Sequence, residues 1–248
     1  MIPTDLASLA GLAALVFAAA VLYSSVGHGG ASGYLAAMAL FGVATDVMKP
    51  AALVMNVIVA LVGTVRFGRA GLVPWRMLAA LFIGSLPAAF AGGLIQLSTA
   101  SHKFLLGVVL LFAAGRLLWL GSASVLRHVP PPALGLAMIG AALGLISGLT
   151  GVGGGIFLSP LLLLTGWEDT RRCAGASVVF ILANSASGLL GHVWAARPVP
   201  SGILPLAAVA LAGGLIGSSL GVRRLPTGAL RRLLAAVLVV AGGKLLFS

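Results

Sequence analysis

Two glycine-rich stretches hold most of the groups in this sequence that could bind a ligand. The first reads SSVGHGGASGYL at residues 24–35, and the second reads SGLTGVGGGIFL at residues 147–158. Glycine is a poor helix former, so each stretch predicts a break inside an otherwise apolar helix. A short helix that begins at such a break presents free backbone N–H groups, which attract negative charge. The pattern therefore indicates hydrogen bonding to an anion.

Polar side chains near the breaks extend this donor chemistry. His28 lies inside the first break, and Ser177, Ser185 and Ser187 lie on one apolar segment. His28 is either a functional ionisable group or a hydrogen-bonded structural residue. Asn56, Asn184 and the serines could equally hold neighbouring helices together by hydrogen bonds. The glycines could also serve only to allow tight helix packing. The residues expected to contact a substrate are Ser25, Gly27, His28, Gly29, Gly30, Asn56, Thr150, Gly151, Gly153, Gly154, Gly155, Ser177 and Asn184.

The sequence lacks the residues that several other chemistries need. Its four acidic residues, Asp5, Asp46, Glu168 and Asp169, all fall at the ends of apolar segments. A buried carboxylate relay or sodium cage is therefore not expected, and an acid-poor interior suits an anion. The lone Cys173 offers no disulfide or metal pair, so we expect no cofactor or metal. No HExxH, GxSxG or similar motif is present, so the sequence does not predict an enzyme.

Composition places these residues in a lipid bilayer. Of the 248 residues, 60% are hydrophobic and only 8% are charged, and the mean hydropathy is +1.17. A water-soluble core could not bury that much apolar surface. The net charge of +11 does not indicate nucleic-acid binding, because the basic residues are scattered at segment ends rather than clustered. The fold class expected is an all-α polytopic membrane protein.

Ten apolar segments are expected along the chain, with short connections. The second and seventh are the shortest, and each directly follows a glycine break. His192 lies near the end of the eighth and is expected at the interface. The segments cover residues 6–26, 32–44, 50–65, 74–95, 103–120, 133–150, 156–166, 173–194, 201–222 and 230–247.

The two halves of the sequence are repeats of one another. Residues 27–30 match residues 151–154 at an offset of 124, with His28 opposite Val152. After an insertion around WEDTRR the offset becomes 128, which pairs Asn56 with Asn184. The prolines at 130–132 separate the halves. We therefore divide the chain into an N-terminal membrane repeat, residues 1–128, and a C-terminal membrane repeat, residues 129–248.

Five segments in each repeat predict that the second repeat enters the membrane the opposite way round. With the N-terminus outside and every segment crossing, four cations lie outside, namely Lys49, Lys103, Arg197 and Lys244. Eleven then lie inside, namely Arg66, Arg69, Arg76, Arg116, Arg127, Arg171, Arg172, Arg223, Arg224, Arg231 and Arg232. This excess favours inverted repeats with both termini outside. If the two short segments alone dipped in and returned, the count would be eight against seven, with no orientation signal.

The sequence resembles the TauE/SafE family of membrane permeases over nearly its whole length. The likeness rests on SSVGHGGASGYL, GLISGLTGVGGGIFLSPLLL, ASVVFILANSASGLLGHVWA and GGLIGSSLGVRRLPTGALRRLLAAVLVVAGGKLL. The resemblance implies transport of a small sulfur-containing anion, such as sulfite, sulfoacetate or a related sulfonate. It also implies a multi-pass protein of the bacterial inner membrane, and with the charge count it predicts periplasmic termini.

A transporter working by alternating access is the function that these observations favour, and an anion channel is the alternative. The expected partners are the small anionic substrate and the lipid bilayer. The anion, the driving ion, the direction of transport and the oligomeric state stay open, because small-residue faces suit packing either within one bundle or within a homo-oligomer.

Overall fold

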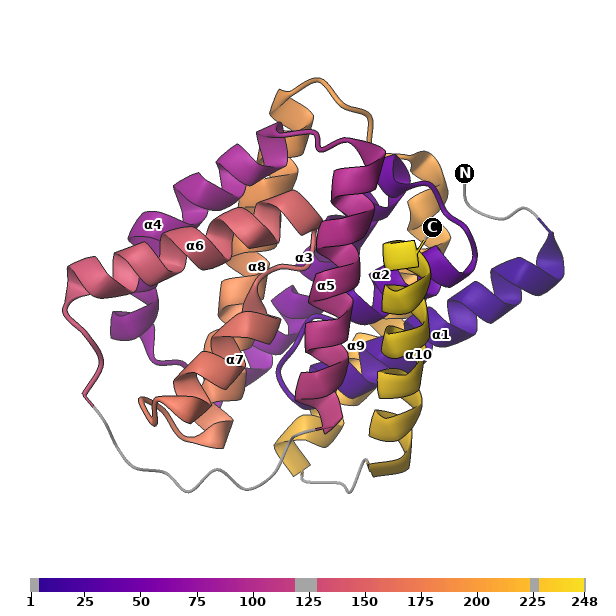
Figure 1. Cartoon of the computed structure of the whole chain (residues 1–248). Coiled ribbons are helices and arrows are strands. Elements are labelled where there is room, and N and C mark those ends of the chain that lie inside the picture. The colour runs from indigo at the N-terminus through magenta and orange to yellow at the C-terminus, as the bar shows by residue number, and fades with distance from the viewer. Residues whose placement is uncertain (1–4, 119–128, 224–227, 248) are drawn as a thin grey trace.

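A computed structural model describes residues 5–118, 129–223 and 228–247 of the chain (Figure 1). Over these residues it contains only helices, which confirms the all-α prediction. The helices are α1 (Leu6–Ser25), α2 (Ala31–Leu40), α3 (Thr45–Arg69), α4 (Trp75–Leu94), α5 (Thr99–Leu118), α6 (Ala133–Thr150), α7 (Gly155–Leu164), α8 (Thr170–Trp194), the short 3-10 helix η1 (Ser201–Ile203), α9 (Leu204–Arg223) and α10 (Gly228–Phe247). By length and composition, α1, α3, α4, α6 and α8 could each cross a bilayer. The chain is a multi-pass membrane protein.

Helices α1 and α2 form a hairpin whose tip is the first glycine break. A Cβ atom added to Gly11 would touch the ring of Phe41, and one added to Gly33 would touch Ala19, so the two helices run antiparallel. Helix α2 has ten residues, which make about 15 Å of helix, or half the hydrocarbon thickness of about 30 Å. It does not cross the bilayer alone.

Helices α6 and α7 are joined by the second break, but they pack on each other less closely than α1 and α2 do. Helix α7 also has ten residues. Leu136 near the start of α6 and Leu162 near the end of α7 belong to one hydrophobic cluster, and Figure 1 shows α6 starting on the side where α7 ends. Each hairpin returns to the side of the fold from which it starts. The loops after the hairpins therefore lie on the same sides as they would if all ten segments crossed the membrane.

The antiparallel helices α3 and α8 cross at the centre of the fold. Gly63 lies against Val178, and Gly188 lies against Leu53, so the start of one helix lies beside the end of the other. Helix α2 leads into the start of α3, and α7 leads into the start of α8. The two hairpins therefore insert from opposite ends of the α3–α8 pair, as an inverted repeat requires. The orientation of these ends in a bilayer stays a prediction.

The most extensive contacts between helices come in matched pairs when the halves are exchanged, although the packing of α2 on α10 has no comparable counterpart between α7 and α5. Helix α1 packs on α9, and its counterpart α6 packs on α4. Likewise α3 contacts α9 while α8 contacts α4, and the equivalent helices α5 and α10 pack on each other. Each hairpin is thus fastened to the fourth helix of the opposite half. The proposed boundary between residues 128 and 129 adjoins residues 119–128, which lie outside the described residues.

Glycines make the α4–α6 contact close. Cβ atoms added to Gly140, Gly144 and Gly148 would collide with the backbone carbonyl oxygens of Leu81, Ser85 and Ala89 respectively. The two helices therefore pack backbone against backbone, as small residues permit in membrane helices.

The four acidic residues serve helix ends, as their positions in the sequence indicate. The Asp5 carboxylate caps α1 by accepting the Ser8 N–H at 2.8 Å, and this hydrogen bond lowers the pKa of Asp5. Asp169 caps α8, and Asp46 lies in the first turn of α3. Glu168 forms an i,i+4 ion pair with Arg172.

The four cations that the charge count places outside lie together at one end of the fold. Lys49 and Arg197 line one pocket, and Lys103 and Lys244 line a second. Both pockets include Thr45, Asp46 and Thr99, so they are neighbours. Arg127 and Arg224, from the opposite set, lie outside the described residues.

Single cysteines in two loops will test the orientation. We expect Ser98→Cys, between α4 and α5, to react with a membrane-impermeant maleimide on intact cells, because its loop lies on the cation-poor side. Ala70→Cys, between α3 and α4, should react only after permeabilisation. Both variants are made in a Cys173→Ser background, which removes the native thiol. That thiol is buried, so little change in the fold is expected. Labelling of both cysteines on intact cells, or labelling of Ala70→Cys alone, would contradict the orientation.

Replacing Gly144 will test the close packing of α4 on α6. Gly144→Ala should lower stability by about 1–3 kcal/mol, because the added methyl group collides with the Ser85 carbonyl. Gly115→Ala is the matched control, since nothing lies within 4 Å of an added Cβ there. Thermal unfolding in detergent measures both, and equal midpoints would show that the contact tolerates a methyl group.

Candidate functional site

The first break is a tight turn that only glycine builds without strain. Gly27 and Gly30 have φ angles of +78° and +103°, and Gly30 is the N-cap of α2. The Tyr34 hydroxyl, one turn into α2, donates to the Gly29 carbonyl at 2.7 Å. The break is thus held by the short helix that follows it.

The second break repeats this geometry with more glycine. Gly151, Gly153 and Gly154 have φ angles of +82°, +85° and +77°, and Gly154 is the N-cap of α7. The Val152 N–H donates to Thr150 Oγ1 at 3.3 Å. None of the described residues accepts a hydrogen bond from the backbone N–H of Gly153 or Gly154. These groups lie where α7 exposes its own free first-turn amides.

Asn56 joins the two breaks at the middle of α3. Its fully buried amide donates from Nδ2 to the Val152 carbonyl and to Ser185 Oγ, each at 3.2 Å. A Cβ added to Gly29 would lie 2.5 Å from Asn56 Oδ1, and one added to Gly153 would lie 2.6 Å from Asn56 Nδ2. The tips of the two hairpins therefore meet on one side chain.

His28 reaches from the first break to the second hairpin. Its Nδ1 lies 3.1 Å from the Val26 carbonyl, which can only accept, so Nδ1 carries the proton. Its Nε2 lies 3.1 Å from Ser159 Oγ on α7, and Ser159 hydrogen-bonds to Ser177 on α8. In neutral His28, Nε2 accepts a hydrogen bond from the Ser159 hydroxyl. In the imidazolium both ring nitrogens donate, so the Ser159 hydroxyl accepts from Nε2 and donates to Ser177 instead. One proton on His28 therefore sets the direction of the whole chain of hydroxyls.

Other expected site residues lie nearby but use their polar groups locally. Ser25 Oγ donates to the Leu22 carbonyl, and Thr150 Oγ1 donates to the Ile146 carbonyl, both at 2.7 Å. Asn184 is fully buried and donates from Nδ2 to the Phe180 carbonyl of its own helix at 2.8 Å. Gly155 packs on Ile181, which also touches Gly29 and Gly153. The structure thus brings Gly29 and Gly153 together at Asn56, whereas Gly27, Gly30, Gly151 and Gly154 lie against Ala174, Tyr34, Lys49 and Phe180 respectively. The Ser25 and Thr150 hydroxyls mainly cap helix ends.

The arrangement suits a small anion. It combines the N-terminal ends of two short helices with hydroxyl, imidazole and amide groups. None of the four carboxylates, all of which the described chain includes, lies in it, because each serves a helix end.

Comparison with known proteins gives the family. The family described as "Sulfite exporter TauE/SafE" matches residues 12–245. The chain belongs to the TauE/SafE family. A "Probable membrane transporter protein y4hK" of Sinorhizobium fredii is 38% identical over 242 residues, covering 96% of this chain and 98% of that protein. The TauE/SafE chain described here is thus a membrane transporter.

A second similar protein is more distant. A "Probable membrane transporter protein" of Xylella fastidiosa is 34% identical over 85 residues, which cover 34% of this chain and 31% of that protein. No solved structure matches this TauE/SafE chain.

Sequence reasoning missed three features of this TauE/SafE site. At the offset of 124, Ser159 pairs with Leu35 and Tyr34 pairs with Leu158, so repeat symmetry points to neither polar residue. His192, expected at the interface, is only 5% exposed and lines the pocket that contains Lys49. His192 lies in the last turn of α8, outside both breaks, so the sequence gave no signal that it lines a pocket.

The two asparagines of this TauE/SafE chain should differ in importance. Asn56→Leu should lower the rate of solute transport into proteoliposomes about tenfold, because it leaves the Val152 carbonyl unpaired between the breaks. Asn184→Leu should have a smaller effect, since its amide serves only its own helix. Flux is normalised to the amount of folded protein. Unchanged flux in Asn56→Leu would remove it from the site.

Proposed function

We propose that this protein carries a small sulfur-containing anion, such as sulfite, sulfoacetate or a related sulfonate, across the bacterial inner membrane by alternating access. The observation that supports this most directly is the meeting of the two glycine breaks on Asn56. Each break starts a short helix of ten residues, so the positive N-terminal ends of two helices lie at the region where the two breaks meet. The substrate-contacting set is the one expected from the sequence, with Ser159 added.

An anion fits this region better than a cation or an apolar solute. Each helix N-terminus carries about half a positive charge, and the region holds no carboxylate. Ser159 and Ser177 can turn their hydroxyl hydrogens toward a ligand, and His28 can supply a charged donor. The choice of a sulfur oxyanion rests on the family name and on the resemblance in sequence, since the donors themselves suit several oxyanions.

Alternating access is supported by the division of the core. Buried apolar residues form two clusters, one mainly from α1, α2, α5, α9 and α10 and the other mainly from α4, α6 and α8, while α3 and α7 contribute residues to both. The polar layer at Asn56 and Ser185 lies between α3 and α8, where the clusters adjoin. Two rigid parts that rock about a central polar layer are the usual basis of a carrier. The termini are expected on the periplasmic side, from the charge count.

Ligand binding to variants of the two N-cap glycines tests the site. Gly30→Val and Gly154→Val should weaken sulfite binding at least about tenfold, because a β-branched residue is strained at positive φ and its Cβ meets Tyr34 or Phe180. Gly71→Val is the matched control, since Gly71 also has a positive φ, of +67°, but nothing lies within 4 Å of an added Cβ.

Thermal shift of the purified chain with sulfite, sulfoacetate, thiosulfate, sulfate and carboxylates measures this binding, because a ligand that binds the folded state raises the midpoint. Wild-type affinity in both folded site variants would show that the glycines serve packing alone. Flux in proteoliposomes then separates the mechanisms. Saturable exchange is expected of a carrier, and a conductance that does not saturate would indicate an anion channel instead.

A further inference from the structure

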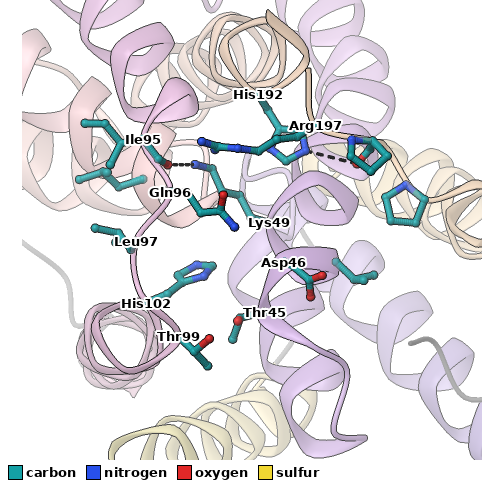
Figure 2. Close-up of a pocket in the computed structure, with 14 residues that line it drawn as sticks. Thr45, Asp46, Lys49, Ile95, Gln96, Leu97, Thr99, His102, His192 and Arg197 are labelled. Atoms are coloured by element: carbon teal, nitrogen blue, oxygen red, sulfur yellow. Dashed lines mark hydrogen bonds between the residues drawn. The ribbon is translucent and has the colours of Figure 1, made fainter. Parts of the chain in front are cut away.

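The pocket lined by Lys49 and Arg197 opens at the end of the fold where α3 begins and α4 ends (Figure 2). Its volume is about 230 Å³. Asp46, Gln96 and Thr99 at its rim are exposed. Lys49, His102 and His192 line it as well, yet they are only 7%, 6% and 5% exposed. The cavity is therefore open at a polar rim and closed by a floor of basic side chains.

Two cations meet at this floor and use their hydrogen-bond donors on one helix end. Lys49 Nζ donates to the carbonyls of Gly92 and Ile95, at 2.9 and 3.1 Å, and Arg197 donates to the Leu94 carbonyl at 2.7 Å. Both also lie 3.4 Å from the Gly93 carbonyl, which places the two charges close together, as Figure 2 shows. Capping the C-terminal end of α4 accounts for these contacts. It leaves two positive charges beside a cavity whose one lining carboxylate, Asp46, is at the exposed rim.

Capping does not account for the two imidazoles. Nε2 of His102 and Nδ1 of His192 are buried and have no hydrogen-bond partner. Their other nitrogens are occupied, by the backbone of Thr150 for His102 and by the Pro198 carbonyl at 3.4 Å for His192. A buried polar atom without a partner is unfavourable by about 1–3 kcal/mol. His102 on α5 and His192 on α8, each with one such nitrogen, both line this cavity beside two cations, and this combination suits a ligand with hydrogen-bonding groups of its own.

We propose that this cavity binds a small oxyanion together with one proton. A neutral imidazole nitrogen offers only a lone pair, so it pairs with an oxyanion once a proton lies between them. The charges of Lys49 and Arg197 favour the anion, which in turn favours the imidazolium. The ionisable groups that face the cavity are Lys49 and Asp46 from α3, His102 from α5, His192 from α8 and Arg197 after α8. Both imidazoles are of the side-chain type that changes charge near neutral pH.

The site is separate from the one at Asn56 but adjoins it. A Cβ added to Gly151 would lie 3.0 Å from the Lys49 carbonyl oxygen, so the second break rests on the backbone of a cavity-lining residue. The cavity thus forms an anion-collecting entrance next to the second hairpin. This inference goes beyond the proposed function, because the cavity would bind an oxyanion whether or not the central site does.

Isothermal titration calorimetry of the full chain with sulfate tests the proposal. Sulfate has no proton to give near neutral pH, so any proton taken up on binding must reach the protein. We expect binding about tenfold tighter at about pH 6 than at about pH 8, with one proton taken up for each anion. Proton uptake is read from the dependence of the heat on the ionisation enthalpy of the buffer. Binding that is independent of pH and buffer would overturn the proposal.

Variants separate this site from the central one. His102→Gln combined with His192→Gln should abolish the proton-linked binding, whereas Lys103→Gln, which alters the neighbouring pocket, should leave it within about twofold. Gly154→Val should retain it, so that failure of the central site and failure of this one are distinguishable. Thermal unfolding identifies a misfolded double variant, in which case each single variant is measured. Undiminished proton-linked binding in folded His102→Gln and His192→Gln would overturn the assignment.

A lipid headgroup could supply the same oxyanion chemistry, so the titration is repeated in nanodiscs. Proton-linked sulfate binding in phosphatidylcholine that is lost in phosphatidylglycerol would assign the cavity to a lipid phosphate. Equal binding in both would assign it to a free anion. Either result supports an oxyanion site, and absence of binding in both would reject it.

Discussion

Backbone N–H and C=O groups that are buried away from water must find partners, and two breaks interrupt the apolar helices of this protein. The rest of the fold follows from how those groups are satisfied. Asn56 pairs with the Val152 carbonyl, Tyr34 pairs with the Gly29 carbonyl, and glycine at positive φ lets both turns close. Amides that the protein does not pair, such as those of Gly153 and Gly154, are available to a ligand. The proposed ligand site would therefore use backbone groups that the helix breaks leave free.

The two halves use one scaffold for different chemistry. At the offset of 128, the position of Ser177 in the second repeat is held by Lys49 in the first. Ser177 lies in the chain of hydroxyls with Ser159 and His28, whereas Lys49 binds carbonyls at the end of α4. Likewise, at the offset of 124, His28 in the first break is equivalent to Val152 in the second break. Equivalent positions in the two halves therefore carry different polar groups, and the cavity lined by Lys49 lies at one end of the fold.

The sequence predicted the features that depend on local chemistry. Glycine clusters break helices wherever they occur, and acidic residues at segment ends become caps, so the breaks, the short helices α2 and α7, and the roles of Asp5 and Asp169 could be foreseen. The cavity could not be foreseen. Lys49, His102, His192 and Arg197 come from three helices and a loop, and each alone looks like an interfacial residue. These four side chains become neighbours only after α4 has packed against α6 and α8.

The packing of the helices also decides which parts could move against each other. Helix α6 is locked to α4 by glycine contacts, and α1 is locked to α9 in the same way, with Gly217 against the Val21 carbonyl. Each of these pairs takes one helix from each repeat, so the repeats themselves cannot separate as rigid bodies without breaking close backbone contacts. The two hydrophobic clusters divide along the same line, one including α1 and α9 and the other including α4 and α6. A rocking motion would therefore carry each hairpin with the fourth helix of the opposite half. It would open or close the polar layer at Asn56 rather than the boundary between the repeats.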